Sequence, residues 1–219
     1  MPINIETKMV SNFRIIRLLG KSLVASECRV ELDIDIAHNA APTDAKHRLQ
    51  AMKIWLEDFV DGSVAYSVRT QVDTTILEEI SNNIIMCPDD PHDHLLLILL
   101  HSKLTAIGGD AIIINRSSMT DDTGEGFSNS VEGYPDDWLP DIETWMGTRS
   151  FWKDPWWSRE DSSTMDIKPD EDDDLEVKPE LGVDLIQLVS TEAASTPTRE
   201  NVAEIIKPGF KPRIITQDD

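Results

Sequence analysis

The fold of this protein is decided by residues 90–114, which read DPHDHLLLILLHSKLTAIGGDAIII. This stretch predicts a buried helix over residues 91–107, a turn, and a buried strand over residues 111–115. Asp90 is expected to cap the helix, Pro91 suits its first turn, and Asp93 complements the positive end of its dipole. Gly108 is expected to take the left-handed conformation that ends it. Because residues 95–100 are apolar almost all round, the helix should be covered by a sheet and also by another domain or a partner subunit.

Two elements are predicted upstream of this helix. Residues 28–37 alternate strictly between apolar and polar side chains, which is typical of a strand with one buried face. Its inward-facing residues are predicted to be Cys28, Val30, Leu32, Ile34 and Ile36. A helix then runs from a cap at Thr43 or Asp44 to about Val60 and ends at Asp61-Gly62. Its apolar residues recur at helical steps and should pack on that strand.

The other elements are indicated by shorter patterns. Residues 64–72 predict a second strand, and residues 126–133 a fourth one after the strand at 111–115. A short helix is predicted over residues 74–85, with Ile76, Leu77, Ile80 and Ile84 facing inward. Residues 1–25 carry Met9, Phe13, Ile16 and Leu19 at helical steps, which favours a helix over the alternative of an edge strand. The expected fold is α+β, a small mixed or antiparallel sheet of about four strands covered by two or three helices.

Composition limits the classes of partner. The 219 residues include 41 acidic and 20 basic side chains, so the formal net charge is −21. This charge repels phosphates and anionic lipids, and we expect no direct binding to nucleic acid or membranes. The chain has no apolar run of membrane-spanning length and no signal peptide pattern, which predicts a soluble cytoplasmic protein, or a virion protein if the source is viral. Its two cysteines, Cys28 and Cys87, are expected to be buried thiols.

The chain is expected to divide into four parts. Residues 1–133 form the α+β core domain, and residues 134–167 a tryptophan-rich, loop-rich extension packed on the core or on a partner. Residues 168–192 are an acidic linker with a short helix near 181–189, and residues 193–219 an extended C-terminal arm. Between residues 120 and 192 there are 21 acidic residues and only five basic ones. Such acidity favours disorder, but disordered segments are poor in aromatic residues, and this region is not.

The tryptophans and the arm are the candidate interface. Tryptophan is favoured at protein interfaces because it buries a large area and keeps a polar tip, although a loop packed on its own domain explains the same residues. In the arm, prolines set an extended backbone between apolar anchors. The predicted interface residues are Trp138, Trp145, Trp152, Trp156, Trp157, Phe210, Ile214 and Ile215.

One cluster resembles a metal or acid–base site. It comprises His92, His94 and His101 with Asp89, Asp90 and Asp93. His94 and His101 are two helical turns apart, about 10 Å along the axis, so one ion cannot easily bind both. The chain also has no glycine-rich phosphate loop and no nucleophile elbow. We therefore predict no metal site, no catalytic residues and no cofactor.

These observations favour a non-enzymatic structural or interaction protein, a subunit of a larger assembly. A folded body with an extended arm is a common plan in such assemblies, viral particles included, since an arm gains contact area while adding little volume. Two alternatives stay open. One is an acidic mimic of nucleic acid that inhibits a host enzyme. The other is a metal-dependent hydrolase built on the histidine cluster.

Overall fold

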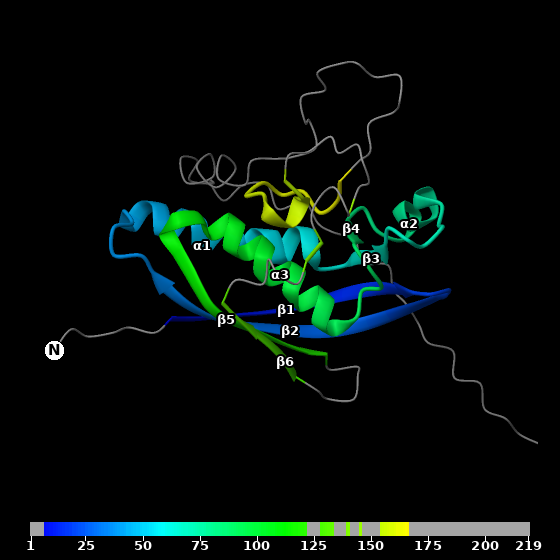
Figure 1. Cartoon of the computed structure of the whole chain (residues 1–219), viewed down its shortest axis with the longest axis horizontal. Coiled ribbons are helices and arrows are strands. Elements are labelled where there is room, and N and C mark those ends of the chain that lie inside the picture. The colour runs from blue at the N-terminus through cyan, green and yellow to red at the C-terminus, as the bar shows by residue number, and fades with distance from the viewer. Residues whose placement is uncertain (1–6, 122–127, 134–138, 141–144, 146–153, 167–219) are drawn as a thin grey trace, which may run out of the picture.

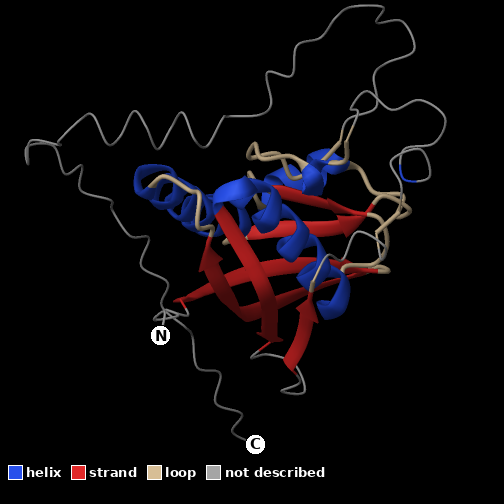
Figure 2. Ribbon diagram, turned by 60° about the vertical axis from the view of Figure 1, so that its left-hand side comes forward, coloured by secondary structure: helices blue, strands red, loops and turns tan. Residues whose placement is uncertain are grey.

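The computed structural model describes residues 7–121, 128–133, 139–140, 145 and 154–166. These residues form an α+β fold with one mixed sheet and three α-helices, so the predicted fold class is confirmed. The sheet has six strands and not about four, in the order β4-β3-β1-β2-β5-β6. Figure 1 shows α1 and α3 together on one face of this sheet, and Figure 2 shows the strong twist of its strands.

The long hairpin of β1 and β2 forms the middle of the sheet. β1 spans Thr7–Leu19 and β2 spans Ser22–Ile36, paired antiparallel from Thr7↔Ile34 to Leu19↔Ser22. Gly20 in the connecting turn has a φ of 59°, a conformation that glycine adopts without strain. The prediction of a helix over residues 1–25 was therefore wrong for its described part. β1 is also not an edge strand, because β2 lies on one side of it and β3 on the other.

The predicted inner face of β2 is confirmed except at its end. The side chains of Cys28, Val30, Leu32 and Ile34 are buried against the helices, whereas Ile36 is half exposed. β5, Ile112–Asp121, pairs with β2 and continues well beyond the predicted residue 115. β6, Ser128–Glu132, pairs with β5 and forms one edge of the sheet.

β3 and β4 run parallel to β1 and extend the sheet on the side of β1 opposite β2. β3 is Ser63–Ser67, shorter than the predicted 64–72, and is buried along its whole length. α2 spans only Thr74–Ile80, and residues 84–87 are not helix but β4, Ile84–Cys87. In α2, Leu77 is buried as predicted, but Ile76 and Ile80 are exposed, because the sheet covers only one side of this short helix. Cys28 and Cys87 are both buried free thiols, as predicted.

α1 spans Pro42–Ile54 and continues as a π-helical turn over Trp55–Val60. Its N-cap is Ala41 with Pro42 at the first helical position, so neither Thr43 nor Asp44 caps it as predicted. The helical stretch ends at Asp61, as predicted. It packs against α3 and places Trp55, which is fully buried, in the core between helices and sheet.

α3 spans Asp93–Gly108 and crosses the centre of the molecule. His92, not Asp90, is its N-cap residue, and it makes no side-chain capping bond. Gly109, not Gly108, ends the helix with a positive φ of 52°. Arg48 of α1 lies against Gly109, where its Nη1 donates a hydrogen bond of 3.0 Å to the carbonyl of Ile107.

None of the helices in the described part of the chain has both the length and the apolar character to cross a membrane.

Candidate functional site

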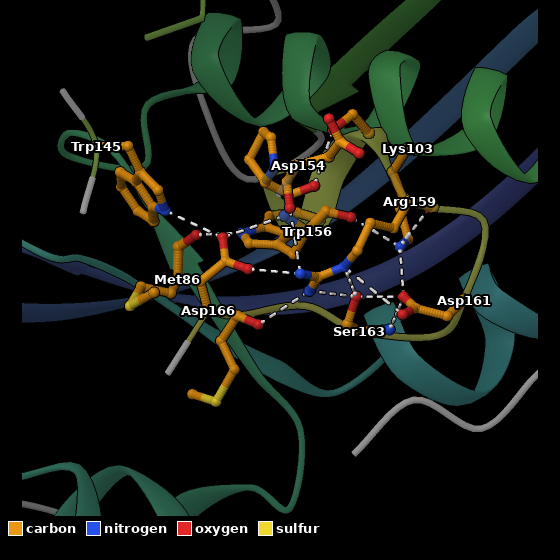
Figure 3. Close-up of polar contacts among 12 residues, drawn as sticks. Met86, Lys103, Trp145, Asp154, Trp156, Arg159, Asp161, Ser163 and Asp166 are labelled. Carbon is orange, nitrogen blue, oxygen red and sulfur yellow. Dashed lines mark hydrogen bonds and ion pairs between the residues drawn. The ribbon is translucent and has the colours of Figure 1, made fainter. Parts of the chain in front are cut away.

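Residues 154–166, here called the tryptophan segment, cover the side of α3 that faces away from the sheet (Figures 1 and 3). The segment includes a short 3-10 turn, Trp156–Ser158. The indoles of Trp156 and Trp157 are 1% and 3% exposed, and Trp145 packs edge-on against Trp157 with ring centroids 5.2 Å apart. We expected another domain or a partner subunit to cover the side of α3 that faces away from the sheet. The tryptophan segment of the same chain covers it instead.

Lys103 of α3 binds the tryptophan segment through three hydrogen bonds. Its side chain is fully buried, and its Nζ donates hydrogen bonds to the carbonyls of Trp156 at 2.8 Å and Arg159 at 2.7 Å. A third bond of 3.2 Å reaches Oδ1 of Asp161. Burial lowers the pKa of Lys103 to about 8, although the Asp161 carboxylate opposes this shift.

Asp166, the last residue of the tryptophan segment, binds other residues of the segment and Trp145. The carboxylate is buried and accepts hydrogen bonds from Trp145 Nε1 at 3.1 Å and from the Trp156 backbone N–H at 3.1 Å. Arg159 Nη1 donates to it at 2.9 Å, and the same guanidinium donates to Ser163 Oγ. Charge-assisted bonds of this kind are roughly twice as strong as neutral ones, so the backbone of the segment is held at both ends.

The tryptophan segment also covers the free edge of β4. The Met86 backbone N–H donates to the Thr164 carbonyl at 2.9 Å, and the Thr164 hydroxyl donates to the carbonyl of Ile84. Trp156 Nε1 donates to the Met86 carbonyl at 2.9 Å. An exposed strand edge is a template for pairing with other chains, so this contact protects one end of the sheet.

The predicted interface residues divide into two groups. Trp145, Trp156 and Trp157 are buried within their own chain, which leaves little indole area for a partner to cover. The other five, together with the proposed linker and arm, lie outside the described residues: Trp138, Trp152, Phe210, Ile214 and Ile215. The interface role of the whole set stays a prediction.

Sequence reasoning missed Lys103, Arg159, Asp161 and Asp166. One signal was present, because Lys103 is a charged residue in a helix otherwise predicted to be buried on every side. The partners of this lysine lie 53 to 58 positions away and carry ordinary polar side chains. Nothing in their local sequence distinguishes them from surface residues.

The pH dependence of stability tests the burial of Lys103. Its pKa is about 8 in the folded chain and near the ordinary lysine value of 10.5 when unfolded, so between these values only the unfolded state keeps the proton. Stability from this group therefore rises as pH increases from 8 to 10.5. We expect the free energy of unfolding of wild type, relative to Lys103→Met, to increase by about 2 to 3 kcal/mol between pH 7 and pH 10. Urea titrations at each pH measure this, and a constant difference would contradict it.

The predicted histidine cluster does not converge. His101 is buried, and its ring nitrogens lie 2.7 Å from Ser117 Oγ and 2.9 Å from the Gly133 carbonyl oxygen. His92 and His94 are exposed, with nearly parallel rings whose centroids are 6.1 Å apart. Within the described ranges, no three His, Cys, Asp or Glu side chains are placed to hold a metal ion. The geometry gives the metal-dependent hydrolase no support.

Arg17 of β1 forms a second buried cluster with Asp93 and Asp121, here called the arginine cluster. The guanidinium pairs with both carboxylates and donates from Nε to Ser26 Oγ at 3.1 Å. Burial alone would lower the pKa of Arg17, but hydrogen bonding and attraction from the two aspartates raise it. One guanidinium is thus shared by two carboxylates.

A polar cavity of about 530 Å³ opens beside the arginine cluster. It lies at the start of α3, next to β6, and is lined by Arg17, His92, Asp93, His94, Asp121 and Asn129. Because Arg17 is already paired with two carboxylates, the described lining of the cavity presents no unpaired arginine or lysine to an anionic substrate. The arrangement favours structural ion pairing over catalysis.

The exposed face of the sheet bears on the nucleic acid mimic. Several of its carboxylates have a basic or amide partner, including Lys8–Asp33 at 3.2 Å, Arg29–Glu31 at 2.9 Å and Asn115–Asp35 at 2.8 Å. A mimic needs an array of uncompensated carboxylates. The two ion pairs compensate Asp33 and Glu31, and the amide of Asn115 engages Asp35, so the described sheet face does not favour this alternative.

Comparison with known proteins adds no relative. Neither the known family models nor the curated proteins include a match to this chain. The function is therefore inferred from the geometry and the sequence alone.

Proposed function

We propose that this protein is a non-enzymatic structural or interaction subunit of a larger assembly, which docks through its C-terminal arm and, within its tryptophan-rich region, through Trp138 and Trp152. The observation that carries the proposal is the attachment of the tryptophan segment to α3 and β4. The segment ends at Asp166, whose carboxylate accepts three hydrogen bonds from Trp145, Trp156 and Arg159. A folded body that holds the base of residues 167–219 at a defined point suits an arm that reaches a neighbour.

The buried charges of the body support a structural role. Lys103, Arg159 and Asp166 fix the tryptophan segment, and the arginine cluster joins the start of α3 to the sheet. Catalytic groups are instead expected to face a cleft where a substrate can reach them. Lys103, Arg159 and Asp166 are enclosed by partners within the chain, and Arg17, Asp93 and Asp121 are already paired with one another where they line the cavity.

The composition of residues 167–219 supports a reaching arm. Residues 167–192 contain nine acidic and two basic residues, and a charged linker of this kind repels itself and extends. Fully extended, its 26 residues span up to about 85 Å. Residues 193–219 balance four acidic against four basic side chains and carry Phe210, Ile214 and Ile215. An arm with apolar anchors on a charged spacer fits docking on another protein, including another subunit of a viral particle.

Sedimentation tests this proposal. At micromolar concentration, the full chain is expected to sediment as an oligomer, or as a complex with a co-purified protein, whereas a chain without residues 193–219 sediments as a monomer. Circular dichroism of both proteins controls for folding. A full chain that stays monomeric and binds nothing would contradict the proposal.

A further inference from the structure

The two edge strands of the sheet, β4 and β6, differ in whether described residues cover them. The β4 edge is covered by Thr164 of the tryptophan segment, as described above. β6 pairs with β5 on one side, and no described strand lies beyond it on the other. Three of the devices that protect strand edges are missing from β6, since Ser128–Glu132 contains no lysine, no proline and no bulge. An unprotected edge strand can accept another strand.

The inner side of β6 offers partial apolar cover and negative charge. Val131 is partly buried and packs against the core, and Asn129 lines the polar cavity with Asp93 and Asp121. Ile98, one turn after His94 on α3, is only partly buried as well. A strand laid along β6 would therefore meet both an apolar surface and the carboxylates of Asp93 and Asp121, which pair with the same guanidinium.

One segment of the chain matches this surface. Residues 205–217 read IIKPGFKPRIITQ, with three basic and no acidic residues, in a protein whose net charge is −21. Within it, Ile214, Ile215 and Thr216 form a β-branched run directly after Arg213. The described residues contain 21 acidic and 12 basic side chains, so the body attracts a basic segment.

We propose that residues 213–216 of a second copy add as a strand to the open edge of β6, with a basic side chain of the arm directed to the cavity at Asp93 and Asp121. This inference rests on the proposed function and names the acceptor surface for the arm. The 46 residues between Asp166 and Arg213 span up to about 150 Å when extended, ample to reach a neighbouring copy.

Pairing of cysteines in the full chain tests the contact. Ser130→Cys on β6 is combined in turn with Ile214→Cys and with Ile215→Cys, and each protein is oxidised mildly with glutathione disulfide. Side chains alternate along a strand, so only one of the two neighbours can face the same side as residue 130. We expect one pair to give about tenfold more disulfide-linked dimer on a non-reducing gel than the other. The matched control replaces Ser130→Cys by Lys53→Cys, on the exposed side of α1.

A second full-length variant tests the same edge without cysteines. Ser130→Lys places a positive charge where the basic arm would lie, and we expect self-association to weaken about tenfold. Asn12→Lys adds the same charge to the exposed face of β1 and should leave association unchanged.

The outcomes separate the two proposals. Dimeric cross-links that favour one of residues 214 and 215 support the inference. Cross-links within one chain, or equal yields from the β6 and α1 positions while the oligomer persists, overturn the inference and leave the proposed function standing. A wild-type chain that neither self-associates nor binds a partner overturns the proposed function itself.

Discussion

Replacing Arg17 by methionine is expected to lower the free energy of unfolding by about 3 to 5 kcal/mol. The side chain of Arg17 is only 6% exposed and pairs with Asp93, at the start of α3, and with Asp121, at the end of β5. Methionine keeps most of the volume but removes the guanidinium that pairs with the buried carboxylate of Asp121. A buried charge that loses its partner costs more than the pair contributed, because the desolvation penalty is left uncompensated.

The matched control lies three residues away on the same strand. Arg14 points to the other face of β1, is largely exposed, and pairs with Asp61 at 3.8 Å. Arg14→Met is expected to change stability by less than about 1 kcal/mol, since exposed ion pairs contribute little. Urea denaturation of both variants at pH 7 measures the difference. Equal effects at the two positions would mean that the arginine cluster is not a buried structural element.

Replacing Trp156 by alanine is expected to cost about 3 to 5 kcal/mol and to detach the tryptophan segment. Its indole is 1% exposed, packs on Trp157, and donates to the Met86 carbonyl on the edge of β4. The substitution removes a large buried side chain and leaves that carbonyl without its partner. Since the carbonyl of Trp156 is also an acceptor of Lys103, the loss should extend along the segment.

Hydrogen exchange separates local from global effects of Trp156→Ala. We expect amides of residues 156–166 and of β4 to exchange faster, while the β1–β2 hairpin keeps its protection. Ile76→Ala on the exposed side of α2 is the control, because it removes an apolar side chain that is 54% exposed. Unchanged exchange in the tryptophan segment would show that it is not held by this indole.

The elements that were predicted correctly are those with a long, regular pattern. The alternation of β2 and the apolar run of α3 each cover more than two periods, so the buried face follows directly from the spacing. Helix ends were predicted less well. Asp90 and Gly108 have suitable side chains for caps, but His92 and Gly109 take those positions because local backbone geometry decides among adjacent candidates.

The elements that were missed depend on distant parts of the chain. β1 carries apolar residues at helical steps, yet it is a strand because β2 pairs with it over thirteen residues. β4 is only four residues long and buried throughout, so it shows no alternation to detect. Lys103 and Asp166 meet groups that no local pattern connects to them. Tertiary contacts overrode local propensity in each case.

If the arm of this protein joins it to other subunits, association requires the apolar anchors of the arm, and sedimentation velocity of full-length variants measures that requirement. Ile214→Asp with Ile215→Asp removes two apolar anchors, and Thr196→Asp with Thr198→Asp adds the same charge upstream in the same arm. We predict that wild type and the threonine variant associate at micromolar concentration, while the isoleucine variant sediments as a 24.6 kDa monomer. Identical sedimentation of all three proteins would contradict the claim.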